Sequence, residues 1–234
     1  MSFQKQILMN ITLLLGVICI FEFTNLDLAL QDHFYLRDCH QWVVDKKDPV
    51  LRMIFYTGIK ALIIAFGTLC FFCWLLSYKV WKLAKYRRFC LLICLALIVV
   101  PATISIIKNI SNVYTPNKIE RYGGDNPYVK VFERYPPLFE QERKGKGWPA
   151  GHASGGFALM MLYYAFTRKK FRIFGLSIGL ILGWTMGLYQ MLKGAHYLSH
   201  TIITMFIAWI LIIIIYRVTS VESVSYTHLR AHET

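Results

Sequence analysis

The sequence predicts an all-α fold, a bundle of six membrane-spanning helices. Its composition is 56% hydrophobic and only 17% charged. The apolar residues also cluster into runs close to the roughly 20 residues that a helix needs to cross a bilayer. The runs are Ile7–Phe23, Gly58–Leu76, Phe89–Ile107, His152–Phe166, Ile173–Leu192 and Thr201–Tyr216. The first and fourth runs are short, and the longest polar stretch, Lys108–Pro149, leaves no room for a soluble domain.

The first apolar run has the length of a signal peptide as well as of a helix. Glu22 and Phe23 follow it, where small residues would mark a cleavage site. We therefore expect an uncleaved first helix.

The net charge of +13 is distributed at the ends of the runs, which indicates a membrane protein and not a nucleic-acid-binding one. Two short loops, Tyr78–Arg88 and Thr167–Arg172, carry Lys and Arg without any acid. By the positive-inside rule both loops are cytoplasmic. The loops Thr24–Thr57, Lys108–Pro149 and Lys193–His200 are then expected outside, and both termini inside.

The chain divides into a membrane domain, residues 1–220, and a polar tail, residues 221–234, expected to be unstructured. Ser225–Thr234 is similar to translated vector sequence, so His228 and His232 are excluded from the site and the natural C-terminus is expected to differ. Cys70 and Cys73 form a C-x-x-C pair without a second pair or a His beside it in the sequence, so neither a zinc nor a redox site is expected.

The long external loop, Lys108–Pro149, carries eight Lys or Arg residues against five acids. It either meets an anionic ligand or is a solvated loop long enough to escape the charge rule. Asp27 and Asp32, in the first external loop, are expected to be solvated and not to bind a cation.

Three chemically distinctive segments fall on the same expected face of the membrane. Lys108 ends the third run, Pro149-Ala150-Gly151-His152 opens the fourth, and Gly194–His200 lies between the fifth and sixth. Pro suits a helix start and Gly lets a ligand approach the backbone closely. The free N–H groups of a first helical turn attract an anion, so the pattern favours a phosphate site.

The histidines supply the chemistry that a phosphate ester needs. His152 titrates near neutral pH and can donate a proton to a leaving alkoxide. His196 can attack phosphorus as a neutral imidazole. His200, four residues later, can accept a hydrogen bond from the His196 ring and fix its tautomer.

In order and spacing these residues resemble the type 2 phosphatidic acid phosphatase superfamily, which is related to the vanadium haloperoxidases. The family's K-x6-R-P motif reads Lys108 followed by Thr115-Pro116. Its P-S-G-H motif reads Pro149–His152. Its S-R-x5-H-x3-D motif reads Tyr189-Gln190, His196 and His200. The resemblance covers about residues 21–215.

The resemblance implies a role for each matching position. His196 would form a phosphohistidine and His152 would protonate the leaving group. Lys108 would bind phosphate oxygens, assisted by the backbone at Gly151. His200 would occupy the position of the family's orienting Asp. Gln190 and Thr115 would occupy the positions of two phosphate-binding Arg residues.

Neutral residues thus replace two phosphate-binding cations, and each lost charge-assisted contact costs on the order of 1.5–3 kcal/mol. Lys193, Arg121 and Arg143 are candidates to compensate. A bacterial lipid A phosphatase-like branch has similar P-A-G-H-A-S and G-A-H-x-L-S-H strings, so the departures are also consistent with a branch signature.

The expected activity is hydrolysis of a membrane lipid phosphate monoester or diphosphate, with no metal or other cofactor. The resemblance implies the bacterial inner membrane as the location, with the active site at the periplasmic face of the six-helix bundle. Two alternatives stay open, a lipid phosphotransferase that uses the same phosphohistidine and a non-catalytic lipid-binding or transport protein. The sequence leaves the lipid and the oligomeric state open.

Overall fold

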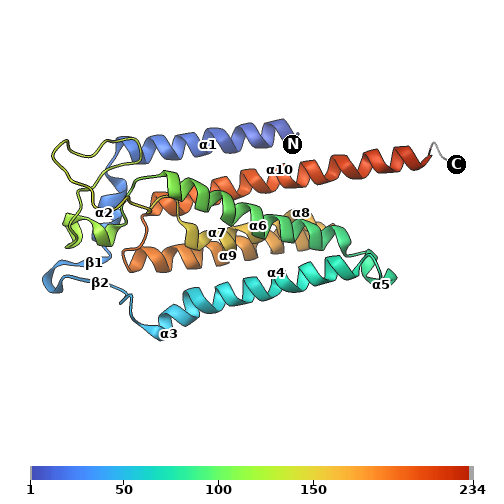
Figure 1. Ribbon diagram of the computed structural model, residues 1–234, viewed down its shortest axis with the longest axis horizontal. Coiled ribbons are helices and arrows are strands. Elements are labelled where there is room, and N and C mark those ends of the chain that lie inside the picture. Colours follow the sequence, from blue (N-terminus) through green and yellow to red (C-terminus); the bar gives the residue numbers. More distant parts are fainter. Residues whose placement is uncertain (1, 232–234) are drawn as a thin grey trace.

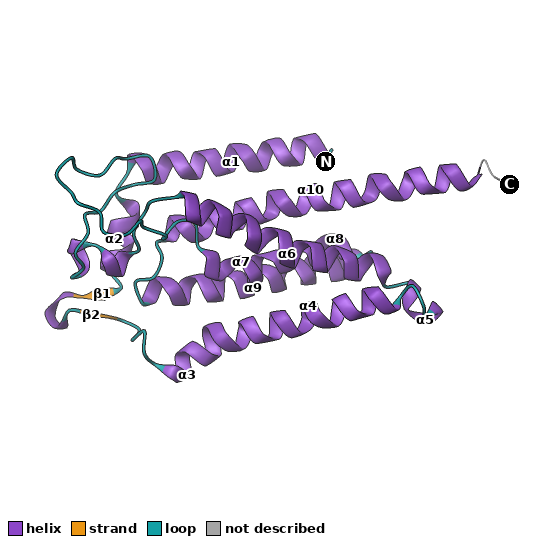
Figure 2. Cartoon of the chain, viewed as in Figure 1, coloured by secondary structure: helices purple, strands orange, loops and turns teal. Residues whose placement is uncertain are grey.

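The computed structural model describes residues 2–231, with side chains as far as residue 220. It is 71% helix and 3% strand, which confirms the all-α class. The helices lie side by side along the long axis of the molecule (Figure 1). The loops and the two short strands gather at one end of the helices (Figure 2).

Five helical segments in the described part of the chain are long and apolar enough to cross a membrane. They are Phe3–Phe23 (α1), Pro49–Leu76 (α3, η2 and α4), Arg87–Ile110 (α6), Lys169–Leu192 (α9) and Leu198–Ser220 (within α10). Each contains one of the predicted apolar runs. The chain is therefore a multi-pass membrane protein by helix length and composition.

The remaining predicted run, His152–Phe166, is helical but interrupted. It consists of α7 (Gly151–Ala158), the 3₁₀ turn η5 (Leu159–Met161) and the short helix α8 (Leu162–Ala165). None of these pieces reaches the length of the other five segments. Helix α10 itself runs Leu198–Ala231, so the predicted tail falls within its last turns as far as residue 231, and residues 232–234 lie outside the described residues.

The second crossing begins with a kinked start that local chemistry explains. Asp48 caps helix α3 (Pro49–Arg52) by accepting hydrogen bonds from the backbone N–H groups of Val50 and Leu51 at 2.8 and 3.0 Å. Proline at the first helical position needs no hydrogen-bond acceptor there. A π-helical turn, η2 (Met53–Thr57), joins α3 to α4 (Gly58–Leu76).

Glycines bring the interrupted helix into contact with α9. Gly175, Gly179 and Gly183 recur every four residues on α9 and meet α7, η5 and α8. A Cβ at Gly179 would lie 2.4 Å from the backbone N of Met160. Small residues at this spacing are what allow membrane helices to pack backbone against backbone. The site-bearing helix α7 is therefore held closely on α9.

The surroundings of the C-x-x-C pair differ from what its neighbours in the sequence indicated. Cys90 and Cys94 of α6 belong to the same buried core cluster as Cys70 of α4, so a second pair does lie beside the C-x-x-C pair. The separation of these residues in sequence hid this contact. All four cysteines, including Cys73, are free thiols.

The loop end is built from short elements. Helix α2 (Leu26–Asp32) precedes an antiparallel pair of strands, β1 (Tyr35–Leu36) and β2 (Gln41–Trp42), separated by the 3₁₀ turn η1 (Arg37–Cys39). The long loop contains two more 3₁₀ turns, η3 (Pro116–Lys118) and η4 (Glu120–Tyr122). The small helix α5 (Trp81–Ala84) lies at the opposite end (Figure 1).

Candidate active site

Three histidines form a continuous chain at the loop end of the bundle. His152 Nδ1 lies 3.0 Å from His196 Nε2, and His196 Nδ1 lies 3.4 Å from His200 Nδ1. His196 and His200 are buried, with 1% and 2% of their surface exposed. Each of the two ring nitrogens of His196 therefore lies within hydrogen-bonding distance of another histidine ring.

Backbone contacts at the start of α7 fix the position of His152. The N–H of Ala150 donates to the carbonyl of His200 at 3.2 Å, which joins the starts of α7 and α10. The hydroxyl of Ser111, just after α6, donates to the carbonyl of Trp148 at 2.5 Å. The segment that leads into His152 is thus tied to two other helices.

A tight turn after α9 places His196. Gly194 adopts a left-handed conformation with φ of 72°, which favours glycine. The N–H of Ala195 donates to the carbonyl of Gln190 at 2.8 Å, and Gly194 accepts from the N–H of Asn117 at 2.9 Å. A Cβ at Gly194 would lie 2.3 Å from the Trp42 ring, so only glycine fits beneath strand β2.

Burial controls the protonation of His196. It lowers the pKa of His196 well below the usual range, and the nearby His152, His200 and Lys108 act in the same direction. A hydrogen bond to the Gly147 carbonyl opposes this shift of the pKa. The ring is therefore neutral near pH 7, the form in which imidazole is a nucleophile.

A cavity of about 750 Å³ opens beside His152, between α4, α6 and α7. At the loop end it is lined by Tyr56, Lys60, Lys108, Gly151 and His152. Its remaining wall is mostly apolar and includes Ile63, Gly67, Phe71, Leu97 and Pro101. The cavity thus has one polar, cationic end and a long apolar body.

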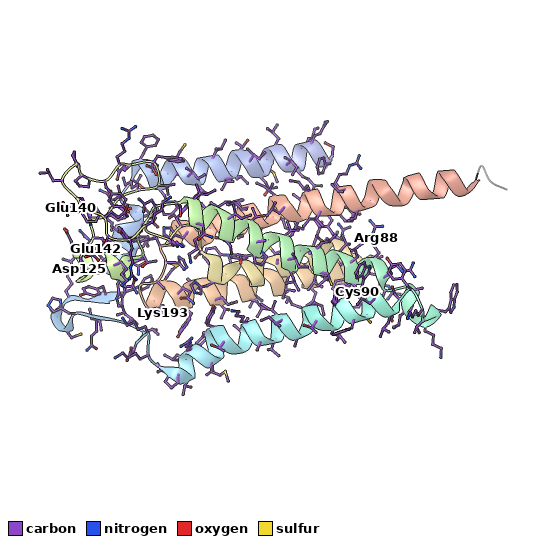
Figure 3. The ribbon with its side chains drawn as sticks, viewed as in Figure 1. Arg88, Cys90, Asp125, Glu140, Glu142 and Lys193 are labelled. Atoms are coloured by element: carbon purple, nitrogen blue, oxygen red, sulfur yellow. The ribbon has the colours of Figure 1, made fainter. Side chains whose placement is uncertain are left out.

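Lysines surround the polar end. A Cβ built on Gly151 would lie 3.9 Å from Lys108 Nζ, so that ammonium is close to the first turn of α7. The charges of Lys108, Lys193 and Lys60 all act on the His152 ring. Lys193 Nζ lies 4.6 Å from the Tyr189 ring centroid and 5.8 Å from that of Tyr56. In Figure 3, Lys193 lies toward the loop end, far from Arg88 and Cys90.

Gln190 is buried near the end of α9, with 1% of its surface exposed. Neither its Oε1 nor its Nε2 has a hydrogen-bond partner in the described part of the chain. An unsatisfied buried amide costs about 1–3 kcal/mol, and Gln190 is not among the residues that line the cavity.

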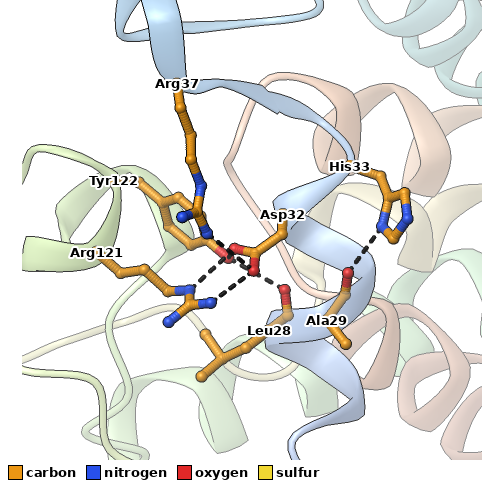
Figure 4. A network of polar contacts seen from close by, with 7 residues as sticks. All are labelled: Leu28, Ala29, Asp32, His33, Arg37, Arg121 and Tyr122. Atoms are coloured by element: carbon orange, nitrogen blue, oxygen red, sulfur yellow. Dashed lines mark hydrogen bonds and ion pairs between the residues drawn. The ribbon is translucent and has the colours of Figure 1, made fainter.

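The structure does not bring Thr115 or Arg121 to the cavity that His152 lines. Thr115 Oγ1 donates to Asn117 Oδ1 at 2.7 Å and, with Arg143, lines a separate cavity in the external loop. Arg121 donates two hydrogen bonds to Asp32, at 2.9 and 2.5 Å. Figure 4 shows Arg37, Arg121 and Tyr122 converging on the Asp32 carboxylate. These hydrogen bonds, chiefly that from Arg121, lower the pKa of Asp32 to about 2.

Sequence reasoning missed three residues at or beside the site. The ring of Tyr56, placed by the π-helical turn, packs edge-on against His152 with centroids 5.1 Å apart. Lys60 lies inside an apolar run. An ionisable residue within a membrane span is usually functional, so the sequence did contain a signal for Lys60. Asp27, expected to be solvated, is instead buried, with 7% of its surface exposed, against Ser199 of α10.

Among the described residues, no three His, Cys, Asp or Glu side chains are grouped as possible ligands of one metal ion. The reactive groups that the structure brings together at this site are three histidines, three lysines and the first-turn N–H groups of α7.

Comparison with known proteins agrees with this geometry. The model of the PAP2 superfamily matches residues 89–223, which include α6, α7, α9 and the three histidines. No curated protein and no solved structure matches the chain. Members of the superfamily are generally phosphoryl hydrolases that act on phosphate esters. Because the match covers more than half of its length, the chain belongs to the PAP2 superfamily, the type 2 phosphatidic acid phosphatases.

Proposed function

We propose that this protein is a membrane lipid phosphatase that hydrolyses a lipid phosphate monoester or diphosphate through a phosphohistidine on His196. The observation that carries the proposal is the 3.0 Å contact between His152 Nδ1 and His196 Nε2. His152 lies at the cationic end of a cavity whose remaining wall is mostly apolar, and His196 is buried directly behind it. Such a shape fits a molecule with a phosphate at one end and a hydrocarbon chain at the other.

The histidine chain supports a two-step reaction. With the His196 Nδ1 proton directed at His200 or the Gly147 carbonyl, the electron pair on Nε2 accepts from His152 Nδ1 until a bound phosphate displaces this contact. Nε2 attacks phosphorus, the bond from phosphorus to the leaving oxygen breaks, and His152 gives its proton to that oxygen. Water then attacks the phosphohistidine, His152 takes a proton from it, and the P–N bond breaks to release phosphate.

The lysines supply a phosphate clamp in place of the missing arginines. Lys108 and the first-turn N–H groups of α7 hold the transferred phosphate, while Lys60 and Lys193 add positive charge around His152. Fixed donors in a site shielded from water stabilise charge more strongly than they would in bulk solvent.

The apolar body of the cavity accommodates the hydrocarbon chain. The lining residues of η2 and α4 run from Tyr56 to Phe72, which spans about 24 Å at 1.5 Å per helical residue. Ile64, Phe72 and Ile98 on its rim are exposed by 57%, 56% and 65%, so the cavity opens sideways between α4 and α6. A lipid can therefore enter from the membrane.

The proposed setting is the bacterial inner membrane, with the site facing the periplasm. The basic loops Tyr78–Arg88 and Thr167–Arg172 lie at the opposite end of the bundle from the histidines, as the positive-inside rule requires of such a site. In this arrangement α7, η5 and α8 together form the sixth crossing, shielded from lipid by α6 and α9.

The test compares two histidine variants on two substrates. His196→Ala should reduce hydrolysis to background on both a lipid phosphate and an aryl phosphate. His152→Ala should lose about 10²–10⁴-fold on the lipid and far less on the aryl ester, whose leaving group needs no proton. Acid-labile labelled phosphate bound to the wild-type protein would report the phosphohistidine. His33→Ala, at an exposed histidine, is the control, and full activity in His196→Ala would contradict the proposal.

A further inference from the structure

Asp27 of α2 is buried directly against the first turn of α10. The backbone N–H of Ser199 donates to Asp27 Oδ1 at 3.0 Å, and the Ser199 hydroxyl donates to Oδ2 in a short hydrogen bond. A carboxylate in this position satisfies free N–H groups and complements the positive end of the helix dipole. Asp27 therefore caps α10 from another part of the chain.

The capped turn carries the reactive segment. Ser199 immediately precedes His200 and follows His196 by three residues. The carbonyl of His200 also accepts a hydrogen bond from Ala150, two residues before His152. The turn held by this one carboxylate thus contains His200, follows His196 by three residues and is hydrogen-bonded to the segment that precedes His152.

Several charged and titratable groups surround this carboxylate. Lys130 and Tyr128 approach it from the external loop, and Glu22 from the end of α1. Tyr197, just before α10, and His200, in α10, lie on the other side. Burial raises the pKa of Asp27 to about 6, against the opposing effects of the Ser199 hydrogen bonds and of Lys130. The carboxylate is therefore ionised at pH 7 and gains a proton in mildly acidic solution.

We propose that Asp27 is a positioning residue for the phosphatase reaction, which holds the first turn of α10 so that His196 faces His152. The inference rests on the proposed function but not on the family motifs, because Asp27 lies outside the matched residues 89–223. In this chain His200 occupies the position where the family usually has an orienting Asp. The proposal gives an orienting role to an acid of α2, Asp27, instead.

The proposal has a pH signature. Ionised Asp27 accepts both hydrogen bonds from Ser199, whereas the protonated form carries a proton on one oxygen and loses an acceptor. Because its pKa is about 6, kcat should fall as the pH decreases through this value. The pKa of His196 is lowered well below its usual range, so His196 does not account for a decrease near pH 6.

The experiment measures kcat and KM from pH 5 to pH 8 for the full-length protein in detergent with a lipid phosphate. Asp27→Ala should lower kcat about 10²-fold with little change in KM, as expected for a misplaced nucleophile. Asp27→Asn keeps one acceptor oxygen, so we expect about a tenfold loss and no decrease near pH 6. The control Asp32→Asn, on the same helix, should keep both the rate and the decrease.

A second readout needs no turnover. Hydrogen–deuterium exchange of residues 196–201 at pH 7.5 should be faster in Asp27→Asn than in Asp32→Asn or wild type. A wild-type pH profile and wild-type exchange in Asp27→Asn would overturn the proposal, even if Asp27→Ala fails to fold. An inactive wild-type protein would instead contradict the proposed function, and the exchange measurement would still decide the role of Asp27.

Discussion

The two sides of helix α7 use glycine in opposite ways. On the side facing α9, a Cβ at Gly156 would lie 2.5 Å from the backbone N of Gly183. On the side facing α4, a Cβ at the adjacent Gly155 would meet only Ile63, at 3.9 Å, and the cavity begins there. The same residue type therefore closes one interface and opens the other.

This difference separates two requirements of the site. The closed side fixes α7, and with it His152 in the first turn, because backbone contacts between helices leave no room for movement. The open side leaves space beside the same histidine for a substrate. Variants on each side should therefore affect different properties, stability on one and substrate turnover on the other.

The largest effect is expected at the polar end of the open side. Lys108→Met should lower kcat/KM by about 10²–10³-fold, roughly 2.7–4 kcal/mol of transition-state stabilisation, because a phosphate-binding charge is lost. The melting temperature should not fall. Steady-state kinetics and thermal unfolding test this, with Lys118→Met in the external loop as control. A decrease in kcat/KM of less than threefold would show that Lys108 does not bind the phosphate.

On the closed side, Gly183→Ala places a Cβ 2.2 Å from Cδ1 of Phe157. Overpacking of this kind destabilises by about 1–3 kcal/mol, and activity should decline as α7 shifts. Thermal unfolding in detergent measures the change. The matched control is Gly16→Ala in α1, where a Cβ meets nothing within 4 Å. Equal stability of the two variants would show that the glycine contact is not tight.

Filling the open side should change specificity more than stability. Gly155→Leu extends into the apolar body of the cavity, so KM for a long-chain lipid phosphate should rise about tenfold, near 1.4 kcal/mol. A short-chain phosphate does not reach that region and should be hydrolysed as by wild type. Equal losses on both substrates would mean that the hydrocarbon chain lies elsewhere.

The smallest effect is expected away from both sides, at the Asp32–Arg121 pair. The folded-state pKa of Asp32, about 2, lies below the usual value of 3.8 for an aspartate. The contribution of the pair to stability is therefore present above pH 4 and lost as the pH falls toward 2. Arg121 is 43% exposed, so solvent limits this contribution to below about 1 kcal/mol. Asp32→Asn should slightly reduce the melting temperature at pH 7 and leave kcat unchanged. A change in kcat would connect this loop contact to catalysis.

The helices were predictable because the signals that define them are local. The run Gly58–Leu76 coincides with α4, and the run Ile173–Leu192 ends with α9. The meeting of His152 with His196 followed from loop charges and motif spacing together. The interruption of the fourth run was not predictable. The short helices of this run are stabilised by packing against the glycines of α9, and this tertiary contact is not visible in the run itself.

The parts of the site that were missed depend on tertiary contacts. Tyr56 reaches His152 only because a π-helical turn precedes α4, and Asp27 is buried only because α2 folds onto α10. Arg121 looked like a spare cation, but Asp32, 89 residues away in sequence, binds it. Partners so far apart leave no trace in a local pattern.

The lateral opening between α4 and α6 also has a kinetic consequence. A substrate that enters there comes from a two-dimensional pool, so the rate is set by its mole fraction among the surrounding lipids and not by its concentration in the suspension. Diluting the substrate with inert lipid at constant total amount should slow the reaction, whereas diluting the vesicles with buffer should not. Membrane composition would then act directly on flux through this phosphatase.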